Sequence, residues 1–185
     1  MKTLLRDKAD ALFDKYWDDM REEWFKLEVL QDYTGEDDGP SLRNWLEGDK
    51  KKSLELITDE DPKFTADCRL KIAQGVRLTR VHIVEMPLSP YMEWEVEYYK
   101  RLSIPLRGEQ VYLVNAKDLG SLRIPNGDLM LFDSRRAIVN EYDQKVRMVA
   151  SKFYDIDDNL SSFLELKKTL ESHAKKLETG EVNRP

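Results

Sequence analysis

Residues 76–102 read VRLTRVHIVEMPLSPYMEWEVEYYKRL and carry the strongest structural signal in the chain. Residues 76–86 are rich in β-branched side chains and end at Pro87, which predicts a strand in the middle of a sheet. Ser89 followed by Pro90 is typical of an N-cap and a first helical position, so a helix is expected from Tyr91 to Leu102. A helix following a central strand is typical of α/β and α+β domains.

Hydrophobic periodicity predicts the elements on either side of this stretch. Before it we expect an amphipathic helix over residues 3–21, a strand over 24–30, an exposed acidic loop over 33–40, a short helix from Pro40 that Gly48 ends, a solvated turn at 49–52, and a helix over 62–74. In the last helix the expected buried positions are Phe64, Cys68, Leu70, Ile72 and Ala73. After it we expect strands over 109–114, 128–132, 137–142 and 146–153, whose short spacers favour antiparallel hairpins.

These elements predict an α+β or α/β fold with a mixed, partly antiparallel sheet and packed helices. A four-three alternation of apolar residues predicts a long C-terminal helix over residues 155–178. Its stripe consists of Ile156, Leu160, Phe163, Leu170, Ala174 and Leu177. No repeat or long linker interrupts the pattern, so residues 1–178 are interpreted as a single domain and residues 179–185 as a flexible tail.

Composition narrows the range of partners. Of the 185 residues, 41% are hydrophobic and 36% charged, and the formal net charge is -6. The negative charge disfavours direct binding to nucleic acid, and the apolar runs are too short to span a membrane. Charged residues at the N-terminus do not resemble a signal peptide, and Cys68 is the only cysteine, so we expect a cytoplasmic protein.

Familiar catalytic and metal-binding motifs are missing from the sequence. The two histidines, His82 and His173, are far apart, and there is no glycine-rich phosphate loop or nucleophile motif. We therefore assign no catalytic residues and expect no metal and no cofactor. His82 lies in the middle of a predicted strand, where a histidine with satisfied hydrogen bonds is commoner than a general base.

A set of short motifs resembles one known family. The motifs are Phe25-Lys-Leu-Glu28 with Asp32-Tyr33, Trp45-Leu-Glu-Gly48, Arg80-Val-His-Ile-Val84, Pro87-Leu-Ser-Pro-Tyr91, Glu95, Gly108-Glu109 and Pro125 to Asp133. In this order they resemble an actinobacterial domain-of-unknown-function family that is often encoded beside helix-turn-helix regulators. The resemblance implies an accessory member of a small regulatory module and transfers no catalytic residue. The chain departs from the family pattern at Asn126-Gly127 and Leu129-Met130, where a histidine and an aromatic pair are common.

One region combines aromatic and ionisable side chains and is the candidate ligand site. Tyr91, Trp94, Glu95 and Tyr98 are three or four residues apart and share a helix face. This face follows the strand of Arg80 and His82, and Arg80 is expected to pair with Glu95. Asp128, on a later strand, completes the candidate ligand-binding set. The alternative is a buried aromatic layer with one structural ion pair, which is the more common arrangement.

The sequence favours a non-catalytic regulatory or interaction protein over an enzyme. Such a protein acts through contacts with a protein partner, or as a homo-oligomer, through the C-terminal helix, with a small-ligand pocket as an additional element. The alternative is a hydrolase or nuclease with a metal-dependent site made of carboxylates and one lysine. Its candidate residues are Glu93, Glu95, Glu97, Lys100, Asp128 and Asp133.

Overall fold

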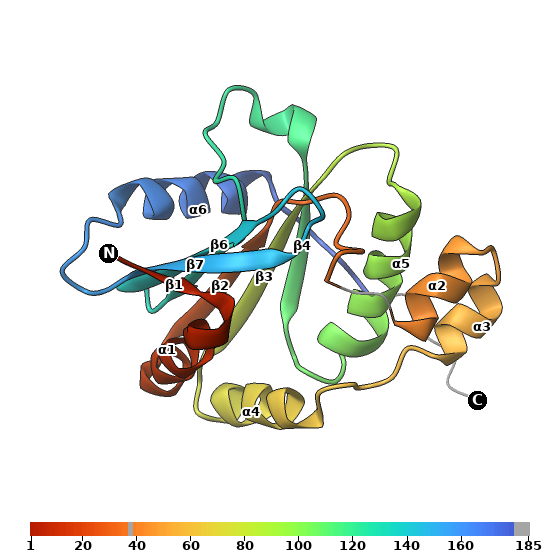
Figure 1. Ribbon diagram of the computed structural model, residues 1–185, viewed down its shortest axis with the longest axis horizontal. Coiled ribbons are helices and arrows are strands. Elements are labelled where there is room, and N and C mark those ends of the chain that lie inside the picture. Colours follow the sequence, from red (N-terminus) through yellow and green to blue (C-terminus); the bar gives the residue numbers. More distant parts are fainter. Residues whose placement is uncertain (37–38, 180–185) are drawn as a thin grey trace.

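A computed structural model describes residues 1–36 and 39–179, and Figure 1 shows a twisted sheet with helices on both faces. The helices are α1 (Arg6–Asp19), α2 (Pro40–Leu46), α3 (Lys50–Glu55), α4 (Pro62–Ala73), α5 (Pro90–Tyr98) and α6 (Ser161–His173). The strands are β1 (Lys2–Leu5), β2 (Glu23–Glu28), β3 (Arg77–Val84), β4 (Gln110–Asn115), β5 (Leu129–Phe132), β6 (Arg136–Tyr142), β7 (Met148–Tyr154) and β8 (Lys175–Lys176). A π-helical segment, η1 (Tyr99–Ser103), continues α5, and a 3-10 turn, η2 (Ala116–Leu119), follows β4.

In the described residues the eight strands lie in the order β1-β7-β6-β5-β2-β3-β4-β8. The central strands β2, β3 and β4 are parallel, and every other pairing is antiparallel. The predicted fold class, a mixed and partly antiparallel sheet with packed helices, is therefore confirmed. The central position of β3 and the two hairpins β5–β6 and β6–β7 are confirmed as well.

The pleat of β2 and β3 divides the core into two layers. Phe25 and Val81 face α6, and Leu166 and Leu170 of this helix pack against them. Trp24 and Leu78 point to the opposite face, where α1 and α4 cover them. Because side chains alternate along a strand, Lys26, Glu28, Arg80 and His82 lie on this second face, further along the same strands. α5, together with Leu42 and Trp45 of α2, covers the end of that face.

The N-terminal prediction was wrong in its first residues. Residues 3–5 belong to β1, which pairs with β7, and the helix begins only at Arg6. Leu5 continued the helical apolar stripe in the sequence, but its side chain is 63% exposed. The strand forms because its backbone hydrogen-bonds to the edge of β7. The spacing of apolar residues within residues 3–21 gives no information about such long-range pairing.

The predicted turn at residues 49–52 is helical. Asp49 accepts a hydrogen bond from the backbone N–H of Lys52 at 3.0 Å and so caps α3. In α4, Cys68 is buried as predicted, but Leu70 and Ile72 are 56% and 38% exposed. The reason is Lys71, which is buried because its Nζ donates to the carbonyls of Asp18 and Met20 at the end of α1.

The long C-terminal helix is only partly present, because α6 is 13 residues long. Before it, Asp155 and Asp158 form a turn in which the Asp158 carboxylate accepts from the N-terminal ammonium group at 2.7 Å. After it, β8 pairs with β4. Of the predicted tail, residues 180–185 lie outside the described residues, as do Asp37 and Asp38 of the predicted acidic loop.

Within the described parts of the chain, no helix combines the length and the apolar composition that crossing a bilayer requires.

Candidate functional site

Two neighbouring parallel strands bring four ionisable side chains to one face of the sheet. Lys26 is in register with Arg80, and Glu28 is in register with His82. All four lie beyond the apolar layer of Trp24 and Leu78, where α5 and η1 cover the sheet. A buried polar layer therefore lies between two apolar parts of the core.

Arg80 is the centre of this layer, with carboxylates on both sides. Its Nη1 donates to Glu28 Oε1 at 2.5 Å and its Nε donates to Glu109 Oε2 at 2.6 Å. Burial lowers the pKa of Arg80, but Glu109 and Glu28 raise it well above its ordinary value. The predicted pairing of Arg80 with Glu95 was wrong, because two carboxylates from distant parts of the sequence take its donors.

His82 is completely buried and both of its ring nitrogens have partners. Nε2 lies 2.8 Å from the Leu30 carbonyl oxygen and Nδ1 lies 2.9 Å from the Tyr99 hydroxyl. A carbonyl only accepts, so in the neutral ring Nε2 carries the proton, and the single Tyr99 hydroxyl proton can serve either Nδ1 or Glu28 Oε2 but not both at once. Burial holds the pKa of His82 below its ordinary value, although Glu28 opposes this. The arrangement agrees with the interpretation of His82 as a satisfied strand residue.

Glu28 and Glu95 face each other across Tyr99 with opposite protonation tendencies. Burial raises the pKa of Glu28, but Arg80 and Lys26 outweigh it and hold that pKa well below its ordinary value. For Glu95, burial and then the charge of Glu28 hold the pKa well above its ordinary value. Tyr99 donates to Glu28 Oε2 at 2.5 Å, whereas Glu95 Oε2 has no hydrogen-bond partner among the described residues. Glu28 therefore favours its ionised form and Glu95 its protonated form.

Asp128 belongs to an adjoining structural cluster. Tyr33 donates to its Oδ1 at 2.6 Å and Tyr142 donates to its Oδ2 at 2.7 Å. Burial raises the pKa of Asp128, an effect that Lys26 opposes and Glu28 reinforces. The two hydroxyls tie the loop after β2 and the end of β6 to the core.

The aromatic face of α5 is divided between packing and a pocket. Tyr91, Trp94 and Tyr98 form a chain of ring contacts with centroids 5.6 Å apart at each step. Trp94 donates its indole N–H to Ser41 Oγ at 2.9 Å, which joins α5 to α2. Only Tyr98 of these three also lines the pocket described next.

A pocket of about 260 Å³ lies between the polar layer and helices α1, α4 and α5, and we call it the α4–α5 pocket. Of the predicted ligand-binding residues it contains Arg80, Glu95 and Tyr98. His82, Tyr91, Trp94 and Asp128 lie outside it. Its full lining is Phe13, Trp24, Lys26, Phe64, Arg80, Glu95, Tyr98, Tyr99, Ser103, Arg107 and Met130.

Three residues that line the α4–α5 pocket each carry a buried polar atom without a partner among the described residues. In the described part of the chain six buried side-chain polar atoms are unpartnered, and three of them belong to lining residues: Trp24 Nε1, Glu95 Oε2 and Ser103 Oγ. Such atoms are rare in folded proteins and costly, and they call for an explanation such as a ligand or bound water. Tyr99 and Ser103 come from η1, where the Ile104 N–H donates to the Tyr99 carbonyl at 2.9 Å, five residues apart. π-helical segments of this kind are frequent at functional sites.

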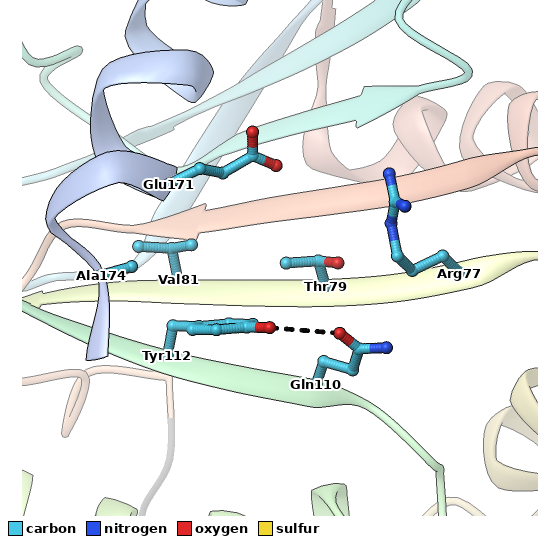
Figure 2. A pocket seen from close by; sticks show the side chains of 7 residues that line it. All are labelled: Arg77, Thr79, Val81, Gln110, Tyr112, Glu171 and Ala174. Atoms are coloured by element: carbon cyan, nitrogen blue, oxygen red, sulfur yellow. Dashed lines mark hydrogen bonds between the residues drawn. The ribbon is translucent and has the colours of Figure 1, made fainter. Parts of the chain in front are cut away.

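A second cavity, of about 340 Å³, lies on the opposite face of the sheet beside α6. Figure 2 shows Glu171 of α6 above it and Tyr112 donating to Gln110 on β4, at 3.2 Å. Arg77 at its rim is bound to Glu23 at 2.6 Å. Among the described residues no unpartnered buried atom lines this cavity, so its polar groups do not call for a ligand.

The polar layer holds one group with metal-ligating atoms: Glu28, His82 and Glu95, whose nearest ligand atoms lie within 4.8 Å of one another. The surroundings do not suit a cation. Lys26 Nζ and Arg80 already neutralise Glu28, at 2.6 and 2.5 Å, and the Tyr99 hydroxyl lies between the ligand atoms.

The carboxylates considered for a hydrolase or nuclease do not converge. Glu93 is exposed and pairs with Lys50, and Glu97 pairs with Lys100 at 3.0 Å. Asp133 accepts backbone N–H groups of residues 21–23, at the other end of β2. Only Glu95 of this set lines the α4–α5 pocket.

Sequence reasoning missed most of the residues around Arg80. The positions of Lys26 and Glu28 could have been predicted, because these residues alternate with Phe25 and Leu27 in one strand. Arg80 and His82 alternate with Val81 in another strand in the same way. Two adjacent strands with charges at every second position indicate a shared polar face. Ser103, Arg107 and Glu109 carried no such signal, since they follow the end of a helix.

Residues 11–179 match the family described as a domain of unknown function (DUF6879). No curated protein matches the chain. Among solved structures, the phospholipase D family member Nuc from Salmonella typhimurium is similar in fold, with a TM-score of 0.50 and 9% identity over 95% of each chain. At this identity the likeness concerns the fold alone.

Two further structures are more distant. TrmBL2, an archaeal chromatin protein, gives a TM-score of 0.43 at 10% identity, covering 95% of this chain and 55% of that one. Phosphatidylserine synthase from Haemophilus influenzae Rd KW20 gives 0.48 at 11% identity, covering 95% and 39%. This chain thus spans about half the length of the first protein and less of the second, and neither likeness informs its function.

Proposed function

The chain belongs to the DUF6879 family, and we propose that it is a non-catalytic regulatory protein that binds a small ligand in the α4–α5 pocket. The observation that carries the proposal is the set of buried polar atoms without partners in the lining, on Trp24, Glu95 and Ser103. Leaving a buried donor or acceptor unsatisfied costs about 1–3 kcal/mol. A ligand that hydrogen-bonds to these atoms recovers that cost.

The properties of two candidate nucleophiles, Ser103 in the lining and Cys68 outside it, support binding rather than catalysis. Ser103 Oγ has no base beside it among the described residues, because it has no hydrogen-bond partner at all. Cys68 is fully buried, and burial together with Glu109 raises the pKa of its thiol to about 12. Covalent catalysis needs a nucleophile activated by a base or by a lowered pKa, and neither group meets that condition.

We propose that the protein acts in the cytoplasm of an actinobacterium, in a small regulatory module. In that module it is an accessory partner of a helix-turn-helix regulator and responds to the ligand. The support is the family resemblance together with the ligand pocket. Contact with a protein partner or a second copy through α6 remains part of the proposal. Since Leu166 and Leu170 pack against the chain's own sheet, such a contact uses the outer face of Glu165, Lys168 and Ser172.

The test is a fragment screen read by the indole N–H signals in a 1H–15N correlation spectrum. The set contains carboxylic acids, amines and neutral compounds, each of one ring. We expect at least one compound to shift the Trp24 indole signal, since Trp24 lines the pocket and its indole N–H has no partner among the described residues. Trp45 is a matched internal control, because its Nε1 is also buried and unpartnered but lies outside the pocket.

A pocket-filling variant separates binding in the pocket from binding elsewhere. Ser103→Leu places a larger apolar side chain in the lining and is expected to abolish the shift at Trp24 with the fold retained. If no compound shifts Trp24 in the wild-type protein, or if Ser103→Leu leaves the shift intact, the pocket is not a ligand site. Turnover of any bound compound during the measurement would contradict the non-catalytic part.

A further inference from the structure

The geometry points to a ligand class for this pocket: a small monocarboxylate that carries one flat aromatic ring system. The inference rests on the proposed function, because it names the ligand of the same site. It follows from three independent properties of the lining, namely its charge, its unused hydrogen-bond donors and its aromatic walls.

The charged side chains of the lining are predominantly cationic. Lys26, Arg80 and Arg107 line the pocket together with one carboxyl group, that of Glu95. The charge of Arg80 is neutralised by Glu28, at 2.5 Å between Nη1 and Oε1, and by Glu109, at 2.6 Å between Nε and Oε2. Lys26 also contacts Glu28, so Glu28 and Glu109 together balance the charges of Lys26 and Arg80. Arg107 has its ion-pair partner, Asp59, only at 3.9 Å, so an anionic ligand beside Arg107 is favoured over a cationic one.

Two of the cations have donors to spare. Lys26 Nζ has Glu28 Oε1 at 2.6 Å as its carboxylate partner among the described residues. Arg107 is 8% exposed, and its guanidinium donates from Nε to Thr65 Oγ1 at 3.2 Å and pairs with the Asp59 carboxylate only at 3.9 Å. A guanidinium presents five N–H donors in a planar fork that matches a carboxylate. Arg107 and Lys26 are therefore the groups that receive the ligand's carboxylate.

The walls of the pocket are aromatic. Phe13, Trp24, Phe64, Tyr98 and Tyr99 line it. Arg107 lies over the Phe64 ring, 5.2 Å from its centroid, so the cation and the aromatic wall are adjacent. Flat rings gain offset-stacked and edge contacts with such walls. Trp24 and Ser103, whose indole N–H and hydroxyl are buried without a partner in the described part of the chain, belong to the same lining.

Size limits the ligand to one ring system. The volume of about 260 Å³ lies below the range of roughly 300–1,000 Å³ that drug-sized ligands occupy. The space suits a ring with a short acidic arm and excludes a nucleotide. Glu95 is compatible with an anion, because burial and Glu28 raise its pKa and so favour its uncharged form.

The probes are three acids and their neutral amide counterparts: benzoate and benzamide, phenylacetate and phenylacetamide, indole-3-acetate and indole-3-acetamide. Binding to the full-length protein is measured by calorimetry and by the Trp24 indole shift. We expect the best acid to bind at least about tenfold more tightly than its amide, because charge-assisted hydrogen bonds to Lys26 and Arg107 are lost in the amide.

Lys26→Met tests the role of the cation and Lys51→Met is its control, since Lys51 is exposed on α3. Lys26→Met should weaken the acid about tenfold or more and leave the amide unchanged, and Lys51→Met should change neither. Amides or amines that bind as well as the acids, or an acid affinity that survives Lys26→Met, would overturn the ligand class while the pocket proposal stands. Failure of the whole fragment set to shift Trp24 would overturn the proposed function itself.

Discussion

At the scale of single residues, the buried layer contains groups that hold the fold together and groups that are free to act. Arg80 and Glu28 belong to the first kind, because each has charged partners closer than 3 Å. Glu95 belongs to the second kind, since one of its oxygens is buried without a partner. The two kinds differ in what a substitution does to stability.

Arg80→Gln and Glu95→Gln should therefore behave differently in the free protein. Arg80→Gln leaves Glu28 and Glu109 buried without their common cation, and we expect a loss of about 3–5 kcal/mol in the free energy of unfolding. The raised pKa of Glu95 favours its uncharged form, which Gln resembles in shape, so the loss for Glu95→Gln should stay within about 1 kcal/mol. Urea denaturation at pH 7 measures both. Equal losses for the two variants would mean that Glu95 is ionised and paired after all.

The pH dependence of stability gives a second test of Glu95. Its folded-state pKa lies well above the ordinary value of 4.5, so between these two values the folded protein binds more protons than the unfolded chain. Stability then falls as pH rises through this window. Glu95→Gln removes this titrating group and with it the loss of stability. We therefore expect the free energy of unfolding of the variant to increase relative to that of the wild type as pH rises above 4.5. Glu93→Gln on the exposed side of α5 is the control and should follow the wild type.

Sequence reasoning located the region of the pocket but did not identify which charged residues pair with one another. Arg80, Glu95 and Tyr98 were found because a strand and the following helix are near neighbours in the sequence. The partners of Arg80 were not, since Glu28 lies 52 residues away and Glu109 lies 29 residues away. Only the parallel pairing of β2 with β3 brings Glu28 beside Arg80, and no local pattern specifies that pairing.

At the scale of elements, α6 is fixed to the sheet by its own apolar residues. Leu166 and Leu170 are buried against the strands, and Leu160 at the helix start is buried with them. The outward positions Glu165 and Lys168 are exposed. The apolar stripe that the sequence offered for a partner is thus largely used within the chain.

Leu170→Ala should destabilise the protein strongly and Lys168→Ala should not. Leu170 is fully buried, and Leu→Ala changes at such sites cost about 2–5 kcal/mol through lost transfer energy and the cavity left behind. Lys168 is exposed on the opposite side of α6, where substitutions usually stay within about 0.5 kcal/mol. Thermal and urea unfolding of the two variants provide the comparison. A mild effect of Leu170→Ala would indicate that α6 leaves the sheet readily and is available for a partner.

Elements were predictable where local signals agree with the tertiary structure. Ser89 caps α5 as its sequence indicated, with a hydrogen bond from the Met92 N–H at 3.1 Å, and the hairpins after β5 followed from their short spacers. Besides the turn at residues 49–52 that proved to be α3, the errors lie at the two ends of the described chain, in β1 and β8. Both are short edge strands whose existence depends on the exposed backbone of β7 and β4, so only the assembled sheet reveals them.

At the scale of the whole molecule, charge sets the range of possible partners. The net charge is -6, and the cations of the buried layer, Arg80 and Lys26, are paired with carboxylates. The run Lys50–Lys52 is the main candidate for contact with phosphates. Lys50 is held by Glu93 at 2.8 Å and lies over the Trp45 ring, so it is partly neutralised.

The purified chain alone should therefore not bind duplex DNA with a Kd below about 1 μM at physiological salt. Sequence-independent binding gains affinity from each phosphate that a protein neutralises, and several such contacts are needed for useful affinity. Lys51 and Lys52 supply at most two, and the remaining surface carries a negative excess that repels the duplex. Fluorescence anisotropy with a labelled duplex measures the affinity, and a titration at low salt shows whether the weak binding that remains is electrostatic.

If the duplex binds tightly, the double substitution of Lys51 and Lys52 to Glu identifies the contact. Loss of affinity would assign α3 as a DNA contact, and retained affinity would locate the contact elsewhere. Either result would remove the need for a helix-turn-helix partner to bring this chain to DNA.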